Sequence, residues 1–124
     1  MEAKVVEVLA GVPAADDSHH FGRPFMSAYQ LAIELHRLHP QVAGALGQPV
    51  GGADIGQRNS LAQYLARQLS GQIAADPEYP VEGAFISNRD VLELRYRATD
   101  GTELRSSLSG SGFELSMFRL RPQE

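Results

Sequence analysis

The 124-residue sequence has no cysteine and no tryptophan, and Lys4 is its only lysine among eleven cationic side chains. The lack of cysteine excludes disulfides, thiolate zinc sites and a cysteine nucleophile. No stretch approaches the roughly 20 apolar residues that a membrane-spanning helix needs. No basic, apolar-cored leader opens the chain, so we expect a cytoplasmic protein with no membrane partner. The length suits a single domain.

Acidic residues outnumber basic ones by fifteen to eleven, which gives a net charge of −4 at pH 7. This balance argues against a protein that coats phosphate over its whole surface, although a local basic face is still compatible with it. Only residues 19–75 have a positive balance, with four arginines against two acidic residues, and they also hold all four histidines. Arginine suits bidentate contacts to carboxylate, phosphate or guanine, while a GC-rich coding sequence would also favour it over lysine.

Proline and glycine divide the first two thirds of the chain into helices and loops. We expect residues 1–21 to form an arm, in which 4–10 is a short strand or a helical turn. Residues 22–121 are expected to form the domain. Hydrophobic periodicity predicts a helix from about Phe25 to His39, a short helical piece at 42–46, a glycine-rich loop at 47–56 and a helix from about Gln57 to Ala74.

The last third of the chain has the alternating pattern of strands. Residues 91–98 alternate cleanly, and Asp100-Gly101 is a hairpin signal. A three-residue loop, 99–101, with Gly101 in the left-handed region pairs Tyr96 with Leu104, Leu92 with Leu108 and Arg97 with Glu103. A two-residue loop would mix the faces, so we predict the former register.

Residues 113–121 are predicted to form the last strand, and residues 84–88 a further one. The apolar phase of the last strand changes near Met117, which indicates either a bulge there or a strand that is covered on both faces. We expect Leu61, Leu65 and Leu69 of the long helix to pack against the hairpin face that carries Leu92, Leu94, Tyr96, Leu104 and Leu108.

Three segments carry a likeness of element order and hydrophobic spacing. They are residues 22–27 (Gly-Arg-Pro-Phe-Met-Ser) before the first helix, residues 60–65 (Ser-Leu-Ala-Gln-Tyr-Leu) in the third, and the apolar positions of the last strand: Phe113, Leu115, Phe118 and Leu120. In this respect residues 22–121 resemble a winged helix-turn-helix domain. The resemblance implies an α+β fold whose third helix enters the DNA major groove and whose wing touches phosphates. The loop before the third helix is longer, and the sheet region larger, than in a minimal domain of this kind.

Carried onto this chain, the resemblance places nucleic-acid contacts on the exposed side of the third helix. That side comprises Arg58, Asn59, Gln63, Arg67 and Ser70. These residue types bond to base edges and phosphates, and no acidic residue occurs between Ile55 and Ala75. The alternative is a solvated amphipathic helix, because two arginines release few counterions.

The hairpin provides a second candidate site. In the predicted register Arg95 lies opposite Arg105 and is flanked by Arg97, an arrangement that could hold phosphate or an acidic partner. Alternatively, Glu93 and Glu103 neutralise these arginines in a surface charge lattice that contributes little.

Two further patterns leave alternatives open. Residues 51–56 are glycine-rich but match neither the G-x-G-x-x-G pattern nor the Walker phosphate loop. They could form a nucleotide site, and the alternative is a flexible connection. His36 and His39 could share a metal, and further ligands could come from a loop: Asp16, Asp17, His19 and His20. However, His36 lies on the apolar side of its helix, which favours a hydrogen-bonded core histidine. We therefore assign no metal and no cofactor.

The sequence thus predicts a non-catalytic, winged-helix-like DNA-binding or regulatory module with double-stranded DNA as its partner. The alternative is a protein-interaction (adaptor) module of the same fold, which would bind a partner chain or a second copy through an apolar patch near Phe113, Met117 and Phe118. A small anion- or metal-dependent enzyme is the third hypothesis. No nucleophile elbow of the form G-x-S-x-G occurs, and we assign no catalytic residue.

Overall fold

The computed structural model describes residues 2–12, 22–42, 61–87, 89–98, 101, 103–107 and 115–122, with the backbone alone at 105–107. These residues form an α+β fold with three helices and five strands. The helices are α1 (Glu2–Ala10), α2 (Ala28–Leu38) and α4 (Leu61–Ala75). The strands are β1 (Met26–Ser27), β2 (Val81–Ile86), β3 (Glu93–Arg97), β4 (Glu103–Ser107) and β5 (Leu115–Leu120). Across these segments, no helix has both the length and the apolar character needed to cross a membrane.

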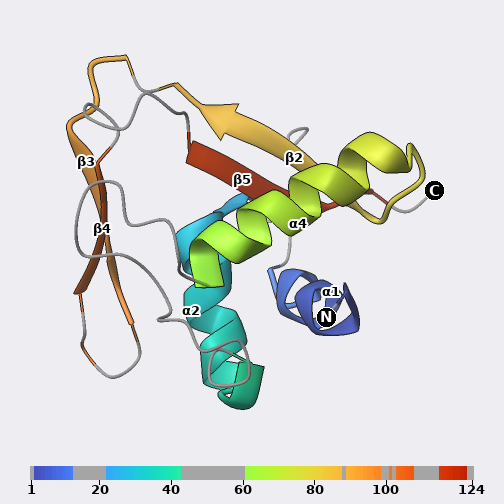
Figure 1. The fold of residues 1–124 in the computed structure, drawn as a ribbon, viewed down its shortest axis with the longest axis horizontal. Coiled ribbons are helices and arrows are strands. Elements are labelled where there is room, and N and C mark those ends of the chain that lie inside the picture. The colour runs from blue at the N-terminus through green and yellow to red at the C-terminus, as the bar shows by residue number, and fades with distance from the viewer. Residues whose placement is uncertain are drawn as a thin grey trace.

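The strands form two antiparallel sheets, one in the order β1-β5-β2 and the other a β3–β4 hairpin (Figure 1). Strand β2 pairs with β5 without interruption, from Val81 opposite Leu120 to Ile86 opposite Leu115. The β5 segment therefore has no bulge. Leu115 and Phe118 are both buried, although their positions in the strand place them on opposite faces. Coverage of both faces therefore explains the change in apolar phase.

The hairpin has the predicted register. Tyr96 is opposite Leu104, Arg97 is opposite Glu103, and Arg95 is opposite Arg105. Gly101 has a φ of 89°, and its N–H donates to the Ala98 carbonyl at 2.9 Å. The left-handed conformation is open to glycine without a Cβ penalty, so turn chemistry and face chemistry agree.

Helix α2 begins three residues later than predicted because a capping box fixes its first turn. The Ser27 hydroxyl accepts a hydrogen bond from the Gln30 backbone N–H at 3.2 Å, and the side-chain Oε1 of Gln30 accepts one from the Ser27 backbone N–H at 2.8 Å. This reciprocal pair satisfies two donors of the helix start. The preceding residues are held in extended form by the sheet, where Met26 lies opposite Phe118 and Ser27 opposite Met117.

Residues 4–10, for which the sequence left a strand or a helical turn open, belong to the helix α1. Its buried residues Val5, Val8 and Leu9 join the common core, so α1 packs on the elements that follow it, a point that the sequence left open. The carbonyl groups at the C-terminal end of α1 are capped by a side chain that is distant in the sequence. The Arg23 guanidinium donates to the carbonyls of Ala10 at 3.2 Å and Val12 at 3.0 Å, where a cation also complements the helix dipole.

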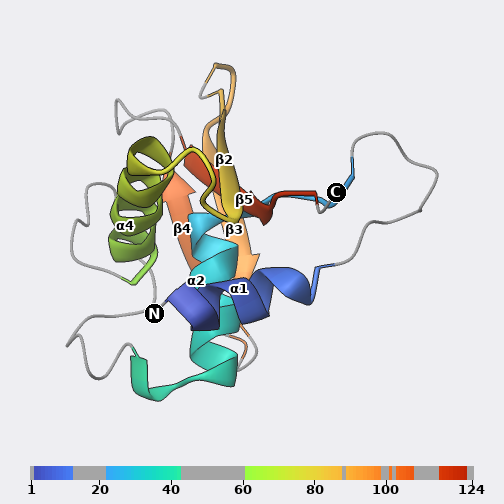
Figure 2. The same ribbon diagram turned by 90° about the vertical axis from the view of Figure 1, so that its right-hand side faces the viewer.

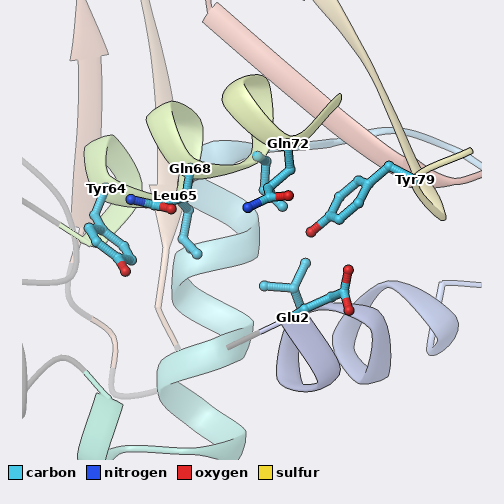
Figure 3. Close-up of a pocket in the computed structure, with 8 residues that line it drawn as sticks. Glu2, Tyr64, Leu65, Gln68, Gln72 and Tyr79 are labelled. Carbon is cyan, nitrogen blue, oxygen red and sulfur yellow. The ribbon is translucent and has the colours of Figure 1, made fainter. Parts of the chain in front are cut away.

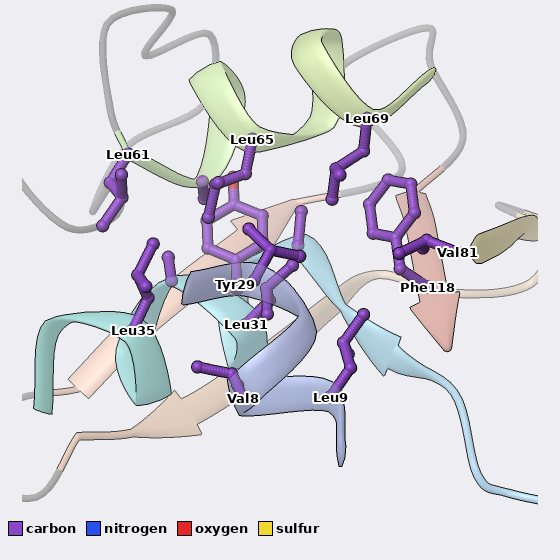
Figure 4. Close-up of a cluster of buried hydrophobic side chains, with 14 of the residues drawn as sticks. Val8, Leu9, Tyr29, Leu31, Leu35, Leu61, Leu65, Leu69, Val81 and Phe118 are labelled. Carbon is purple, nitrogen blue, oxygen red and sulfur yellow. The ribbon is translucent and has the colours of Figure 1, made fainter. Parts of the chain in front are cut away.

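The core lies between the helices and the β2–β5 pair (Figure 4). Leu61, Leu65 and Leu69 are buried as predicted, but α4 packs on α2 and β2. The prediction that the hairpin face would be the main cover of these leucines is wrong. The hairpin is a separate sheet whose Leu94 and Tyr96 reach the edge of the same core, and Tyr96 stacks on Tyr29 of α2. Leu92 is 79% exposed. In both views α2 lies between α1 and the hairpin (Figures 1 and 2).

Arg119 on β5 joins three segments that are distant in the sequence. Its Nε donates to the Glu82 carboxylate on β2 at 2.6 Å, and its Nη1 donates to the Arg23 carbonyl at 2.9 Å. Its guanidinium carbon also lies 4.3 Å from the centre of the Phe25 ring, within the range of a cation–π contact. The Arg119 and Glu82 side chains are only 20% and 24% exposed, so this pair is screened less than a surface pair.

We expect Arg119→Met to lower the free energy of unfolding by about 2 kcal/mol, because Glu82 would be left half-buried without its main partner. Arg37→Met is the matched control, since Arg37 pairs with Glu34 on the surface and such pairs contribute about 0.5 kcal/mol. Urea denaturation of both variants measures the difference. Equal losses would show that the Arg119 network is no more important than a surface ion pair.

Candidate functional site

The first candidate surface is the side of α4 that faces away from the core. Arg67 and Ser70 are exposed and Gln63 is half-buried, and helical periodicity places all three opposite Leu65 and Leu69. The helix contains no acidic residue. The structure therefore brings three of the expected contact residues together on one side. Arg58 and Asn59 lie outside the described residues.

The second candidate surface is the exposed face of the β3–β4 hairpin. Arg95 Nε donates to the Glu93 carboxylate at 2.6 Å and lies 3.9 Å from the Glu103 carboxylate. These contacts, the hydrogen bond to Glu93 first, raise the pKa of Arg95 above its usual range. Arg97 is exposed, and the backbone of Arg105 is opposite that of Arg95. The glutamates thus partly neutralise Arg95, as the charge-lattice alternative expected.

A pair of tyrosines attaches this hairpin to the helices. The rings of Tyr96 on β3 and Tyr29 on α2 are stacked, with centroids 5.6 Å apart and planes 6° from parallel. Among the described residues, the buried Tyr96 hydroxyl has no hydrogen-bond partner. Burial is the main cause that raises the pKa of Tyr96; the neighbouring Ser27 side chain opposes the shift but does not reach hydrogen-bond geometry. Ring stacking therefore holds the hairpin against α2. Burial of the Tyr96 hydroxyl without a partner opposes this packing and lowers its net stability.

The expected environment of His36 is wrong, because this side chain is exposed. The last turn of α2 extends past α1 and α4, which cover its earlier turns (Figure 1). His39 Nε2 lies 2.7 Å from a Glu7 carboxylate oxygen, joining the end of α2 to α1. No cluster of three or more potential metal ligands occurs in the described part of the chain. His19 and His20, like the 51–56 loop, lie outside it.

The predicted apolar patch is also wrong at its centre. Phe118 is 2% exposed because its side of β5 packs into the apolar core, and Met117 is half-buried. Phe113 lies outside the described residues. Among the described residues, the large exposed apolar side chains are Leu38, Phe85 and Leu92, with exposures of 40%, 66% and 79%. Periodicity alone could not find Phe85, because it shares a strand face with the buried Val81 and its exposure depends on where the core ends along β2.

No protein family matches this chain, and no curated protein or solved structure shows significant similarity to it. The choice between functions therefore depends on the geometry of the described residues. Two groups of expected contact residues are placed: Gln63, Arg67 and Ser70 on α4, and Arg95 and Arg97 on the hairpin.

We expect Tyr96→Phe to raise the free energy of unfolding by about 1 kcal/mol, since an unpaired buried hydroxyl costs roughly 1–3 kcal/mol. Tyr96→Leu is the control, because it removes the same hydroxyl together with the ring that stacks on Tyr29, and it should lower stability. Chemical denaturation of both variants provides the measurement. A loss of stability in Tyr96→Phe would mean that the hydroxyl makes a favourable hydrogen bond.

The same burial predicts a loss of stability in alkali. The pKa of Tyr96 is raised in the folded state, so the unfolded chain loses this proton first as the pH rises. The contribution of the protonated Tyr96 to the free energy of unfolding is therefore complete below about pH 10 and declines above it. Thermal unfolding between pH 9 and 11 (about one unit either side of the tyrosine pKa) should show a shallower decline in Tyr96→Phe than in the natural sequence. Parallel declines would contradict the assignment.

Proposed function

We propose that this chain is a winged-helix domain that binds duplex DNA through the outward side of α4. The element order supports the fold assignment. Helices come first and antiparallel strands follow, β1 joins the sheet beside β5, and the β3–β4 hairpin stands where a wing would be (Figure 1).

The observation that carries the proposal is the composition of the exposed side of α4. It presents Arg67, Ser70 and Gln63 with no acidic residue anywhere along the helix. An arginine can bond two acceptors of guanine, a glutamine can bond two groups of adenine, and a serine can bond phosphate. This face therefore suits the polar base edges and phosphates of DNA better than a basic or strongly apolar partner.

The hairpin contributes less to this binding than the sequence implied. Arg95 is already bonded to Glu93, so a phosphate would have to compete with a carboxylate for it. Arg97 is exposed on the same strand and is the better phosphate contact. We accordingly assign recognition to α4 and an accessory electrostatic role to the hairpin.

We expect Arg67→Ala to weaken binding to a random-sequence duplex about tenfold and to reduce the salt slope by about one counterion. Adding Arg95→Ala should weaken binding further, but less, because of the Glu93 bond. Fluorescence anisotropy at low salt, followed by a salt titration, provides both quantities.

Arg37→Ala is the matched control, because it removes an equal charge from the exposed surface of α2. It should leave the affinity within about twofold of the natural sequence, as expected for a residue outside the interface. Two results would overturn the proposal: no binding at low salt, or equal effects of Arg67→Ala and Arg37→Ala.

A second function, association with another protein chain, is favoured by the exposed side chains of Phe85 and Leu92. They flank the connection between β2 and β3 and are among the largest exposed apolar groups of the described residues. A contiguous apolar patch is typical of an interaction surface, and these two side chains would belong to it. Sedimentation velocity would support self-association if a concentration-dependent dimer disappears in Phe85→Ser.

A further inference from the structure

A cavity of about 300 Å³ lies between α1 and α4. Figure 3 shows Tyr64, Gln68 and Gln72 directed into it from α4, with Glu2 on the opposite wall and the Tyr79 hydroxyl pointing between Gln72 and Glu2. The volume is at the lower end of the roughly 300–1,000 Å³ range of small-molecule sites. The site is therefore of a size for a small ligand.

The polar wall on α4 is separate from the proposed DNA face. Tyr64, Gln68 and Gln72 follow one another at four-residue steps, so they share one side of the helix. That side faces α1, whereas Arg67 and Ser70 point away from the core. A ligand in this cavity would thus leave the outward side of α4 open.

Glu2 gives the cavity its charge. No lysine, arginine or histidine is among the described residues that line it. Tyr79 is buried, and burial, followed by the negative charge of Glu2, raises the pKa of this hydroxyl. Tyr79 therefore stays neutral, and its hydroxyl points toward Glu2, whose two carboxylate oxygens can accept from more than one donor (Figure 3).

The remaining wall is apolar. Val5, Leu65 and Leu69 line the cavity and are themselves buried. An apolar wall facing a few convergent polar groups is the usual composition of a ligand site. The Glu2 carboxylate disfavours an anion at this site and favours a cation.

We propose that this cavity binds a small organic amine. The ammonium group donates to Glu2, the Gln68 and Gln72 carboxamides accept from it or bond to a neighbouring polar group, and the apolar body lies on Val5, Leu65 and Leu69. The proposal is independent of DNA binding, since it uses a different side of α4.

The test is an NMR titration of the full chain with 2-phenylethylamine at neutral pH, following amide and side-chain NH₂ signals. We expect saturable shifts at Gln68 and Gln72 with a dissociation constant near about 1 mM, as befits a ligand of this size. The neutral N-acetyl derivative and the anionic 3-phenylpropanoate should each bind about tenfold more weakly, because they lack a charge-assisted bond to Glu2.

Variants separate this site from non-specific binding. Glu2→Gln keeps the shape of the side chain and should weaken amine binding about tenfold without affecting the neutral derivative. Ser70→Ala, on the outward side of α4, is the control and should leave binding unchanged. The proposal is overturned if no saturable shift appears, if the three compounds bind equally, or if Glu2→Gln binds the amine as well as the natural sequence does.

Discussion

The described fold depends on one guanidinium group, that of Arg119. On one side it holds Glu82, which fixes β2 against β5; on the other it holds the Arg23 carbonyl, which fixes the chain entering β1. Arg23 in turn closes the last turn of α1. Two arginines thus connect the first helix to both outer strands. The apolar core supplies most of the burial, while these directional bonds determine which segments meet at that end of the sheet.

Local pattern was sufficient for much of the fold. The position of α4, the identity of its buried leucines and the register of the hairpin follow from periodicity and from Asp100-Gly101, since each depends on residues close in the sequence. The start of α2 was misplaced because Met26 and Ser27 are held by β5, about ninety residues later. The partner of α4 was also wrong, because alternation shows that a strand has an apolar face but not which helix will cover it.

The features of the candidate sites also divide into those that local sequence predicts and those that depend on the folded structure. The pairing of Arg95 with Arg105 was predictable once the register was known. The presence of Glu93 on the same strand also indicated that the charge of Arg95 would be partly neutralised. The exposure of His36 was not predictable, because it depends on how far α2 extends beyond its neighbours. The cavity was invisible in the sequence. It combines Glu2, residues of α4 and Tyr79, and no periodicity connects segments that meet only after folding.

The pairing of β1 with β5 has a consequence for how the domain forms. The pairing of Met26 with Phe118 and the hydrogen bond from Arg119 to the Arg23 carbonyl each join residues more than ninety positions apart, so they form only after β5 has been made. Such long loop closures carry a large entropic cost and slow the folding of a domain. During synthesis, the apolar side chains that β5 covers on α1, α2 and β2 therefore stay exposed until β5 has been made, a period in which a chaperone has access to them.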